Sequence, residues 1–350
     1  MLASMTSSLR TCRTRRAARS AAILLLGLCA AFASAKDKHA QVPGVQPGPR
    51  ATPLRITWLY IQPATSSQKI AQIQIGREMV IMEKSGPWLN VEANTDTQES
   101  NDRDTPMIGG NENSQQAISG WMQAKGIITT STPNGDQVLM GAAANEEILA
   151  STPSGPANAA HAALLLYTRL YELFPNSPLA PEARWRSADI QWQLQRADIS
   201  SLPSSKARQP YMHQQMNEGP LKKVIKMYPH TRWAALAAFD LIANKLCGDW
   251  EGSAKCPEHE TDLYEKYAKD YPNGPRTARA LYQAAYRQAV LTNMYEANGD
   301  HGKAQKAHEH CRALAQQLKE HFAGTDYAWR AGMLVFKLDQ DIPVFGIDQG

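Results

Sequence analysis

The stretch LYTRLYELFPNSPLAPEA, residues 166–183, decides the fold of the second half of the chain. Its apolar and aromatic residues recur every three or four positions up to Phe174, which is typical of a helix with one buried face. Pro175 then ends that helix, because proline lacks the amide hydrogen that a helix interior needs. An alanine-rich helix follows, with Ala183 nine residues after Phe174. The stretch therefore predicts two helices joined by a tight turn.

The same pattern occurs four times in the second half of the chain. In each case an aromatic residue ends one helix, and an alanine lies nine residues further on. The pairs are Phe174 and Ala183, Tyr228 and Ala237, Tyr271 and Ala280, and Phe322 and Ala331. Alanine lets neighbouring helices approach closely and favours the helical state. Residues 159–340 are therefore predicted to form an α-solenoid of about four helix pairs.

Each helix pair is expected to bury an apolar stripe. In the second helix of the first pair the stripe contains Trp185, Ala188 and Trp192, and in that of the last pair it contains Trp329 and Phe336 beside Ala331. Arginines follow the turns between helices, and they either line a binding surface or are simply solvated. They are Arg184, Arg232, Arg276 and Arg279.

The form Leu-Tyr-x-x-Leu-Tyr-x-x-Phe-Pro-Asn-Ser-x-x-Ala-x-x-Ala at residues 166–183 resembles tetratricopeptide-like repeats. Similar repeats occur in the outer-membrane barrel-assembly lipoprotein and in periplasmic coordinators of envelope constriction. The resemblance implies a repeat array that binds other proteins. The chain departs from the lipoprotein in two respects, because Leu28 precedes Cys29 where a lipidation motif has a small residue, and because strands precede the repeats.

Residues 54–130 have the character of a small antiparallel β-barrel. Short runs of strand-forming residues alternate with turn signals such as Lys84-Ser-Gly-Pro87. Residues 94–116 are polar and are expected to form a long loop inserted before the last strand, which lies within Ser119–Ile128. Residues 131–158 are rich in small and turn-forming residues and are expected to be a linker, with one short helix or strand-like cover at Asp136–Ala150.

Residues 55–128 resemble a bacterial SH3-like (SH3b) domain. The matching pieces are Tyr60, Ser66-Ser67 with Lys69-Ile70, Gly76-Arg77-Glu78, Gly86-Pro87-Trp88-Leu89-Asn90-Val91, and Gly120-Trp121 with Lys125-Gly126. Many such domains bind cell-wall peptides or glycans, and others are spacers. The resemblance makes Tyr60, Trp88 and Trp121 candidates for a ligand groove, although such aromatics also fill small cores. Of the two tryptophans, Trp88 is the one expected to be partly exposed, because it follows a Gly-Pro turn.

The first 35 residues are predicted to be an export signal. Five arginines and no acidic residue precede the apolar run Ala21–Ala31, and Ala33-Ser34-Ala35 fits a cleavage site before Lys36. Lipidation at Cys29 and export through the twin-arginine route at Arg15-Arg16 are weaker alternatives. Residues 36–53 are rich in proline and glycine and are expected to be a linker. No later segment has the length and apolar character of a transmembrane helix.

Removal of the signal changes the charge of the protein. The whole chain has 37 Lys+Arg and 33 Asp+Glu, and the signal contains five of the arginines. The mature protein is thus nearly neutral, so no general attraction to nucleic acid is expected.

The cysteines fit an exported protein. Cys247 and Cys256 enclose a glycine-containing loop, and the leading interpretation is a disulfide bond. A metal site is the alternative, with only His259 close in sequence. Cys311 is expected to be a small core residue, although His308 one helical turn away leaves a metal site as a weaker interpretation.

No motif of a hydrolase nucleophile, a phosphate loop or a zinc protease occurs in the sequence. We therefore expect no cofactor, no metal and no enzymatic activity. The sequence favours a periplasmic recognition or scaffold protein that binds a protein or peptide partner of the envelope, including peptidoglycan. The alternatives are a peptidoglycan hydrolase or its accessory subunit, and a component of an outer-membrane assembly or secretion complex. Residues 341–350 are expected to be a tail, and the oligomeric state stays open.

Overall fold

The computed structural model describes residues 48–94, 117–202, 205, 214–248, 250 and 252–345. The predicted signal, residues 36–47 of the predicted linker, residues 95–116 of the predicted insertion, most of the loop after α3 and the last five residues lie outside this part. The strands are β1 (Arg50–Pro53), β2 (Thr57–Tyr60), β3 (Lys69–Ile73), β4 (Met79–Ser85), β5 (Trp88–Asn94), β6 (Ala117–Gln123) and β7 (Ile127–Thr129).

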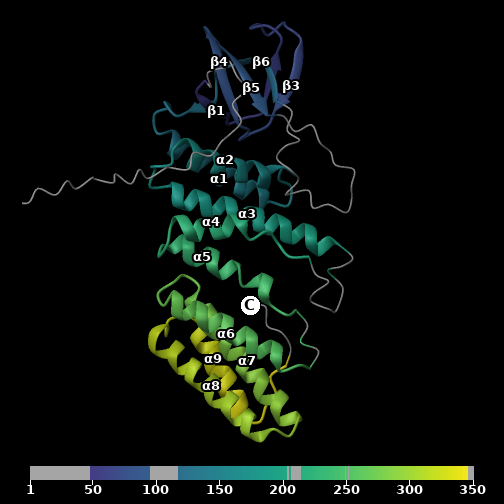
Figure 1. The fold of residues 1–350 in the computed structure, drawn as a ribbon, viewed down its shortest axis with the longest axis vertical. Coiled ribbons are helices and arrows are strands. Elements are labelled where there is room, and N and C mark those ends of the chain that lie inside the picture. Colours follow the sequence, from purple (N-terminus) through teal and green to yellow (C-terminus); the bar gives the residue numbers. More distant parts are fainter. Residues whose placement is uncertain are drawn as a thin grey trace, which may run out of the picture. The chain divides into compact units, whose positions relative to one another are not determined.

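Helices follow the strands in the chain (Figure 1). The α-helices are α1 (Gly135–Ala150), α2 (Ala159–Leu173), α3 (Ala180–Ser201), α4 (Gly219–Met227), α5 (Arg232–Asp240), α6 (Lys255–Asp270), α7 (Thr277–Ala297), α8 (His301–His321) and α9 (Asp326–Asp339). A β region followed by a helical region was predicted, and this order is confirmed. None of the helices in the described part combines the length and the apolar character that a membrane crossing requires.

The strands form one antiparallel sheet in the order β3-β2-β6-β5-β4-β1-β7. Leu59, Val91 and Met122 project from one face into a small apolar core, since alternate residues of a strand point to opposite faces. The prediction that residues 36–53 are a linker is wrong for Arg50–Pro53. This segment is β1, because its backbone pairs with β4 on one side and with β7 on the other.

Helix α1 occupies most of the segment that was expected to be a linker. It buries Leu139 and Ala143 in the same cluster as Leu166, Tyr167 and Leu170 of α2. Gly135 begins α1 against the ring of Phe174, where a β-carbon would come within 2.5 Å of the ring carbon Cζ. A larger residue at this position would require the ring of Phe174 to move.

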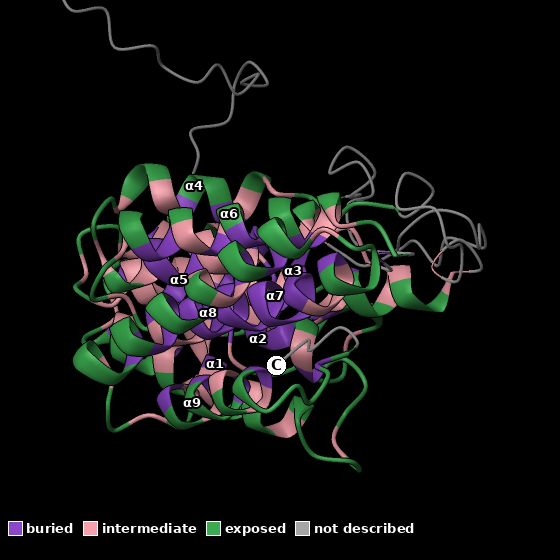
Figure 2. Cartoon of the chain, turned by 90° about the horizontal axis from the view of Figure 1, so that it is seen from below, coloured by how far each residue is buried: buried purple, intermediate pink, exposed green. Residues whose placement is uncertain are grey.

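The four predicted aromatic residues occupy equivalent places in the structure. Each is the residue that directly follows the first helix of a pair, namely α2, α4, α6 or α8. The four predicted alanines are fully buried in the second helices, α3, α5, α7 and α9. Figure 2 shows the buried residues concentrated where helices face one another. The side chains of Thr231 and Thr325 accept hydrogen bonds from the first turns of α5 and α9, which fixes where these helices begin.

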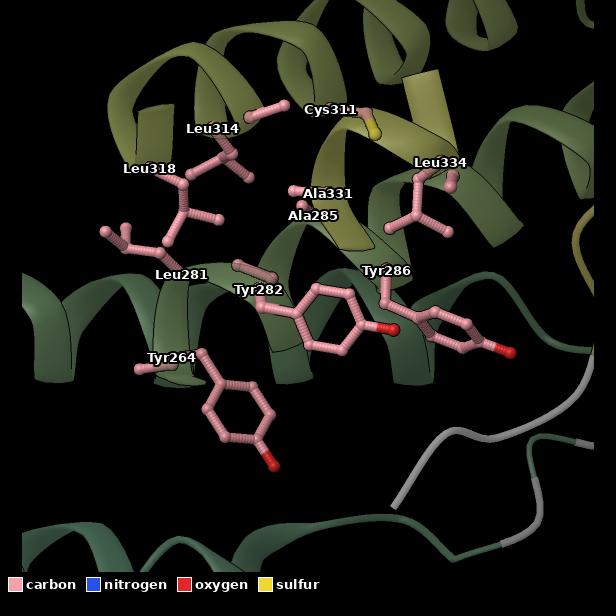
Figure 3. Packing of buried hydrophobic residues seen from close by; sticks show 14 of the residues in the cluster. Tyr264, Leu281, Tyr282, Ala285, Tyr286, Cys311, Leu314, Leu318, Ala331 and Leu334 are labelled. Atoms are coloured by element: carbon pink, nitrogen blue, oxygen red, sulfur yellow. The ribbon is translucent and has the colours of Figure 1, made fainter. Parts of the chain in front are cut away.

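Helices α6 to α9 share one large apolar cluster (Figure 3). Leu314 and Leu318 of α8 lie in it with Leu281 and Tyr282 of α7, and Ala331 of α9 belongs to the same cluster. Cys311 is completely buried there, as predicted for a small core residue.

The prediction that Trp329 and Phe336 are buried in the last pair is wrong. Their exposed fractions are 68% and 62%, because α9 turns Ala331, Leu334 and Leu338 toward the cluster instead. The chain after α9 returns to α7, where Tyr286 donates a hydrogen bond to the carbonyl oxygen of Phe345 at 2.7 Å.

An ion cluster links the sheet to α2. The guanidinium of Arg50 in β1 pairs with Glu78 and lies 2.7 Å from the carboxylate of Glu172 in α2. Arg169 of α2 reaches the same two carboxylates, at 3.1 Å and 2.5 Å. Each carboxylate thus meets two arginines, one from the sheet and one from the helix.

Candidate functional site

The three aromatic residues predicted to form a ligand groove lie on one face of the sheet. Tyr60 in β2 is directly opposite Trp121 in β6, and its ring meets that of Trp88 edge-on, with centroids 5.6 Å apart. Leu59, Leu89 and Met122, their neighbours in the chain, point into the core. The aromatics therefore project from the opposite face.

The expectation that Trp88 rather than Trp121 is partly exposed is wrong. Only 9% of Trp88 is exposed, since the ring of Tyr60 packs against it, whereas Tyr60 and Trp121 are half-buried. Trp88 thus packs against the ring of Tyr60 and offers little surface to a ligand.

Trp58 is the exposed aromatic that the sequence reasoning missed. It is 40% exposed, and it shares the face of Tyr60 because it lies two residues earlier in β2. The ammonium group of Lys69 in β3 lies 4.8 Å from the centre of its ring. The alternation of Trp58, Leu59 and Tyr60 was the signal that could have revealed it. We call Trp58, Tyr60, Trp88 and Trp121 the aromatic face.

The aromatic face borders an edge of the sheet. In the described part of the chain, β3 pairs only with β2, and its Ile70 lies in a bulge between the two strands. Ile70 extends over Gly120 of β6, where a β-carbon would come within 2.7 Å of its Cδ1 atom. Glycine at this position lets a side chain of the edge strand reach across the sheet. Ile70 makes this contact on the core-facing side of the sheet, as Leu59 does, while the rings, the Lys69 ammonium group and the edge of β3 lie close together on the other side.

Arginines after the helix turns stack on rings in the helical region. The guanidinium of Arg184 lies 3.9 Å from the ring centre of Tyr171, and that of Arg279 lies 5.4 Å from the ring centre of Phe239. Arg232 lies 5.4 Å from the ring centre of Trp233, while Arg276 is exposed. Such stacking holds a cation in place and adds to packing.

A polar groove of about 280 Å³ lies between α6, α7 and α8. Its lining includes the buried polar pair Thr261 and Gln288, whose hydrogen bond is 3.1 Å long. Acidic residues come from α6 and basic ones from α8, including His310. The Glu265 carboxylate lies 2.6 Å from Nε2 of His310 and raises the pKa of that imidazole. The opposing charges suit a ligand that carries both signs.

Two carboxyl groups interact between α3 and α5. Burial raises the pKa of Asp240 to about 7, and the negative charge of Asp189 adds to this rise. Burial likewise raises the pKa of Asp189. The positive charges of Arg276 and Arg196 act in the opposite direction on both groups.

The disulfide between Cys247 and Cys256 is confirmed. Its loop is held by Glu260 of α6, whose carboxylate accepts hydrogen bonds from the backbone amide of Cys247 at 2.8 Å and from the Trp250 indole at 3.2 Å. The loop and the helix pair α6–α7 thus share one buried carboxylate.

The structure separates the residues that were weighed as a metal site on α8. His308 lies 3.0 Å from the carboxylate of Asp339, whereas Cys311 is buried in the apolar cluster. Burial raises the pKa of the Cys311 thiol to about 12, so the thiolate that binds metals is strongly disfavoured. No group of three or more metal-ligating side chains occurs within the described residues.

The chain was also compared with known proteins. No protein-family model matches it, and no curated protein does.

Proposed function

We propose that this chain is a non-catalytic recognition or scaffold protein of the cell envelope. In this proposal the sheet is an SH3b-like domain that holds a wall fragment or peptide, and the helix pairs are a tetratricopeptide-like scaffold. The observation that carries the proposal is the aromatic face, with Trp58 exposed beside the Lys69 ammonium group. The disulfide supports export, because such bonds persist in oxidising compartments.

The chemistry of the aromatic face favours a ligand that has both a flat apolar surface and a negative charge. A tryptophan ring stacks on sugar rings or apolar side chains, and an adjacent lysine attracts a carboxylate. Peptidoglycan combines sugar rings with carboxylates, so we propose it as the ligand class. The edge of β3, which pairs only with β2 among the described strands, would add backbone hydrogen bonds to a peptide lying beside it.

Two buried titratable side chains of the described part have structural tasks, which supports binding over chemistry at these positions. Glu260 is occupied by the disulfide loop and by Arg287, and Cys311 is buried with its thiol protonated. Catalytic groups instead need access to a substrate in a cleft.

Co-sedimentation of the purified protein with insoluble peptidoglycan tests the proposal. We expect the wild-type protein to pellet, and a variant that combines Trp58→Ala with Lys69→Ala to stay in the supernatant. Ile148→Ala is the control, since Ile148 of α1 is an exposed apolar residue outside both the sheet and α9. Circular dichroism before sedimentation verifies that each variant is folded.

Failure of the wild-type protein to pellet would contradict the choice of ligand. Pelleting of the double variant at the wild-type level would show that the aromatic face is not the binding surface. A pull-down from envelope extract, with the same variants, then measures whether a protein partner is retained. If the wild-type protein retains nothing in either assay, the recognition function itself is wrong.

A further inference from the structure

Helix α9 carries an uncovered apolar stripe. Trp329, Met333 and Phe336 are 68%, 42% and 62% exposed, and they lie on one side of the helix at spacings of four and three residues. Gly332 lies between them and is also exposed. We call these four residues the α9 stripe.

Equivalent positions of the three preceding pairs contact the next pair. The position eleven residues after the helix-ending aromatic is Trp185, Phe239, Tyr282 and finally Met333. Trp185 stacks on Trp233 with ring centroids 5.3 Å apart, Phe239 meets Tyr267 at 5.3 Å, and Tyr282 meets Tyr327 at 5.8 Å.

The position fourteen residues after the aromatic behaves in the same way. It is Ala188, Ile242 and Ala285 in the first three pairs, all of them buried, and the exposed Phe336 in the last. The α9 stripe is therefore the stacking surface of the array. Terminal helices of repeat arrays ordinarily have polar outer faces, and α9 does not.

The chain after α9 does not cover the stripe in the described residues. Instead, the carbonyl of Val344 accepts a hydrogen bond from the Asn293 side chain of α7, and Val344 is buried there. The surface that internal pairs use for stacking thus stays open at this end.

Gly332 is the second unusual feature of the stripe. A glycine inside a helix costs about 1 kcal/mol relative to alanine. A β-carbon at Gly332 would meet nothing within 4 Å, so the fold of this chain alone does not require glycine there. A glycine in the middle of an apolar stripe lets the backbone of another helix approach closely.

The charged residues beside the stripe indicate which partner binds to it. Asp326 lies in the first turn of α9 and Lys337 in the last, and helical periodicity puts both on the same flank of the stripe. When two copies of α9 pack antiparallel around a two-fold axis at Gly332, that axis brings Asp326 of each copy beside Lys337 of the other. The stripe is therefore complementary to itself, as an interface between identical subunits must be.

We propose that two copies of this chain associate through α9, antiparallel, with Gly332 at the crossing point. At the other end of the array, α2 is not open to the α9 of a second copy, because α1 already packs on it. One helix face is a small interface compared with the roughly 800 Å² per partner of typical stable complexes, so we expect a dissociation constant in the micromolar range. The association surface is distinct from the aromatic face and does not depend on the proposed function.

Sedimentation velocity of the purified protein between about 1 and about 200 µM tests the association. We expect a monomer that converts to a dimer with rising concentration. A variant that combines Trp329→Ser with Phe336→Ser should stay monomeric over this range. Ile148→Ser, which changes an exposed apolar residue of α1, should dimerise like the wild-type protein. A wild-type protein that is monomeric throughout, or a double variant that still dimerises, would overturn the proposal.

Charge reversal tests the antiparallel arrangement. Asp326→Lys or Lys337→Asp alone places like charges together twice in each dimer, and we expect each to raise the dissociation constant about tenfold or more. The combination of both changes restores opposite charges and should restore most of the affinity. If the loss of dimer affinity in the double variant equals the sum of the losses in the two single variants, this arrangement is contradicted.

Cross-linking tests the crossing point. A cysteine at Gly332 should form a disulfide between copies under mild oxidation, since two cysteines can bridge only when their Cα atoms lie within about 7 Å. Gly141→Cys is the control, because Gly141 is also an exposed glycine inside a helix with open space around it. Equal cross-linking of the two variants, or none at Gly332→Cys, would show that α9 does not cross α9 there.

Discussion

The carboxylate of Glu260 lies 2.7 Å from Nε of Arg287, and the two side chains are only 1% and 2% exposed. The guanidinium of Arg287 also donates to the backbone carbonyl of Gln283 and lies 4.6 Å from the ring centre of Tyr264. The other carboxylate oxygen of Glu260 holds the disulfide loop. This ion pair therefore joins α6, α7 and the loop at one buried point.

We expect Glu260→Gln to destabilise the protein by about 3–5 kcal/mol, because it leaves the charge of Arg287 buried without a counter-charge. Urea unfolding followed by circular dichroism measures the change. Lys266→Gln breaks the exposed Lys266–Asp270 pair and is the control, with an expected loss below about 1 kcal/mol. If the two variants lost similar amounts of unfolding free energy, burial would not make the Glu260–Arg287 pair more important for stability than an exposed pair.

Loss of the disulfide is expected to lower the free energy of unfolding by about 2–3 kcal/mol. The bond joins residues nine apart, and a chain-entropy model gives this magnitude for so short a loop. The variant combines Cys247→Ser with Cys256→Ser, and thermal unfolding is measured with and without reductant. Reductant should lower the midpoint of the wild-type protein toward that of the variant and leave the variant unchanged. A variant with the wild-type midpoint would contradict a stabilising bond.

Enlarging a seam alanine is expected to destabilise the helix pairs. Ala280→Leu inserts a larger side chain into a fully buried position of α7, and overpacking typically costs about 1–3 kcal/mol. Ala297→Leu lies at the exposed end of the same helix and should change the unfolding free energy little. If Ala280→Leu were as stable as the wild-type protein, the seam at α7 would not be tightly packed.

Asp240 is expected to make stability fall as the pH rises. Its pKa is raised to about 7 in the folded protein from an ordinary value of 3.8, so the folded state holds a proton that the unfolded state has released. Its ionisation therefore costs stability progressively from about pH 4 to about pH 7. Asp240→Asn removes this cost, and its melting temperature should exceed that of the wild-type protein at pH 8 by more than at pH 4.

Ile148→Ala, which changes an exposed residue that does not titrate, is the control for this pH dependence. Its difference from the wild-type protein should not grow with pH in the same range. An Asp240→Asn variant whose difference is constant with pH would contradict the raised pKa.

Features that depend on short stretches of sequence were predictable. The ends of α2, α4, α6 and α8 follow from an aromatic residue and the turn after it, and the disulfide follows from two cysteines around a short loop. Of the candidate site, the resemblance to an SH3-like domain singled out Tyr60, Trp88 and Trp121, and the structure puts them on one face of the sheet.

Features that depend on distant parts of the chain were not predictable. β1 is a strand because β4 and β7, far along the sequence, pair with it, although its own residues are typical of a linker. Trp88 is buried by a ring from another strand. Trp329 and Phe336 fit the repeat pattern of a buried stripe, and only the arrangement after α9 shows that nothing in the described residues covers them.

Cys311 has a practical consequence for following the motions of the array. With the other cysteines of the described part joined in a disulfide, it is the free thiol there, and it is completely buried between α7, α8 and α9. A thiol reagent can reach it only while α8 separates from its neighbours. The rate of its modification under native conditions thus reports how often this end of the molecule opens locally, without any engineered probe.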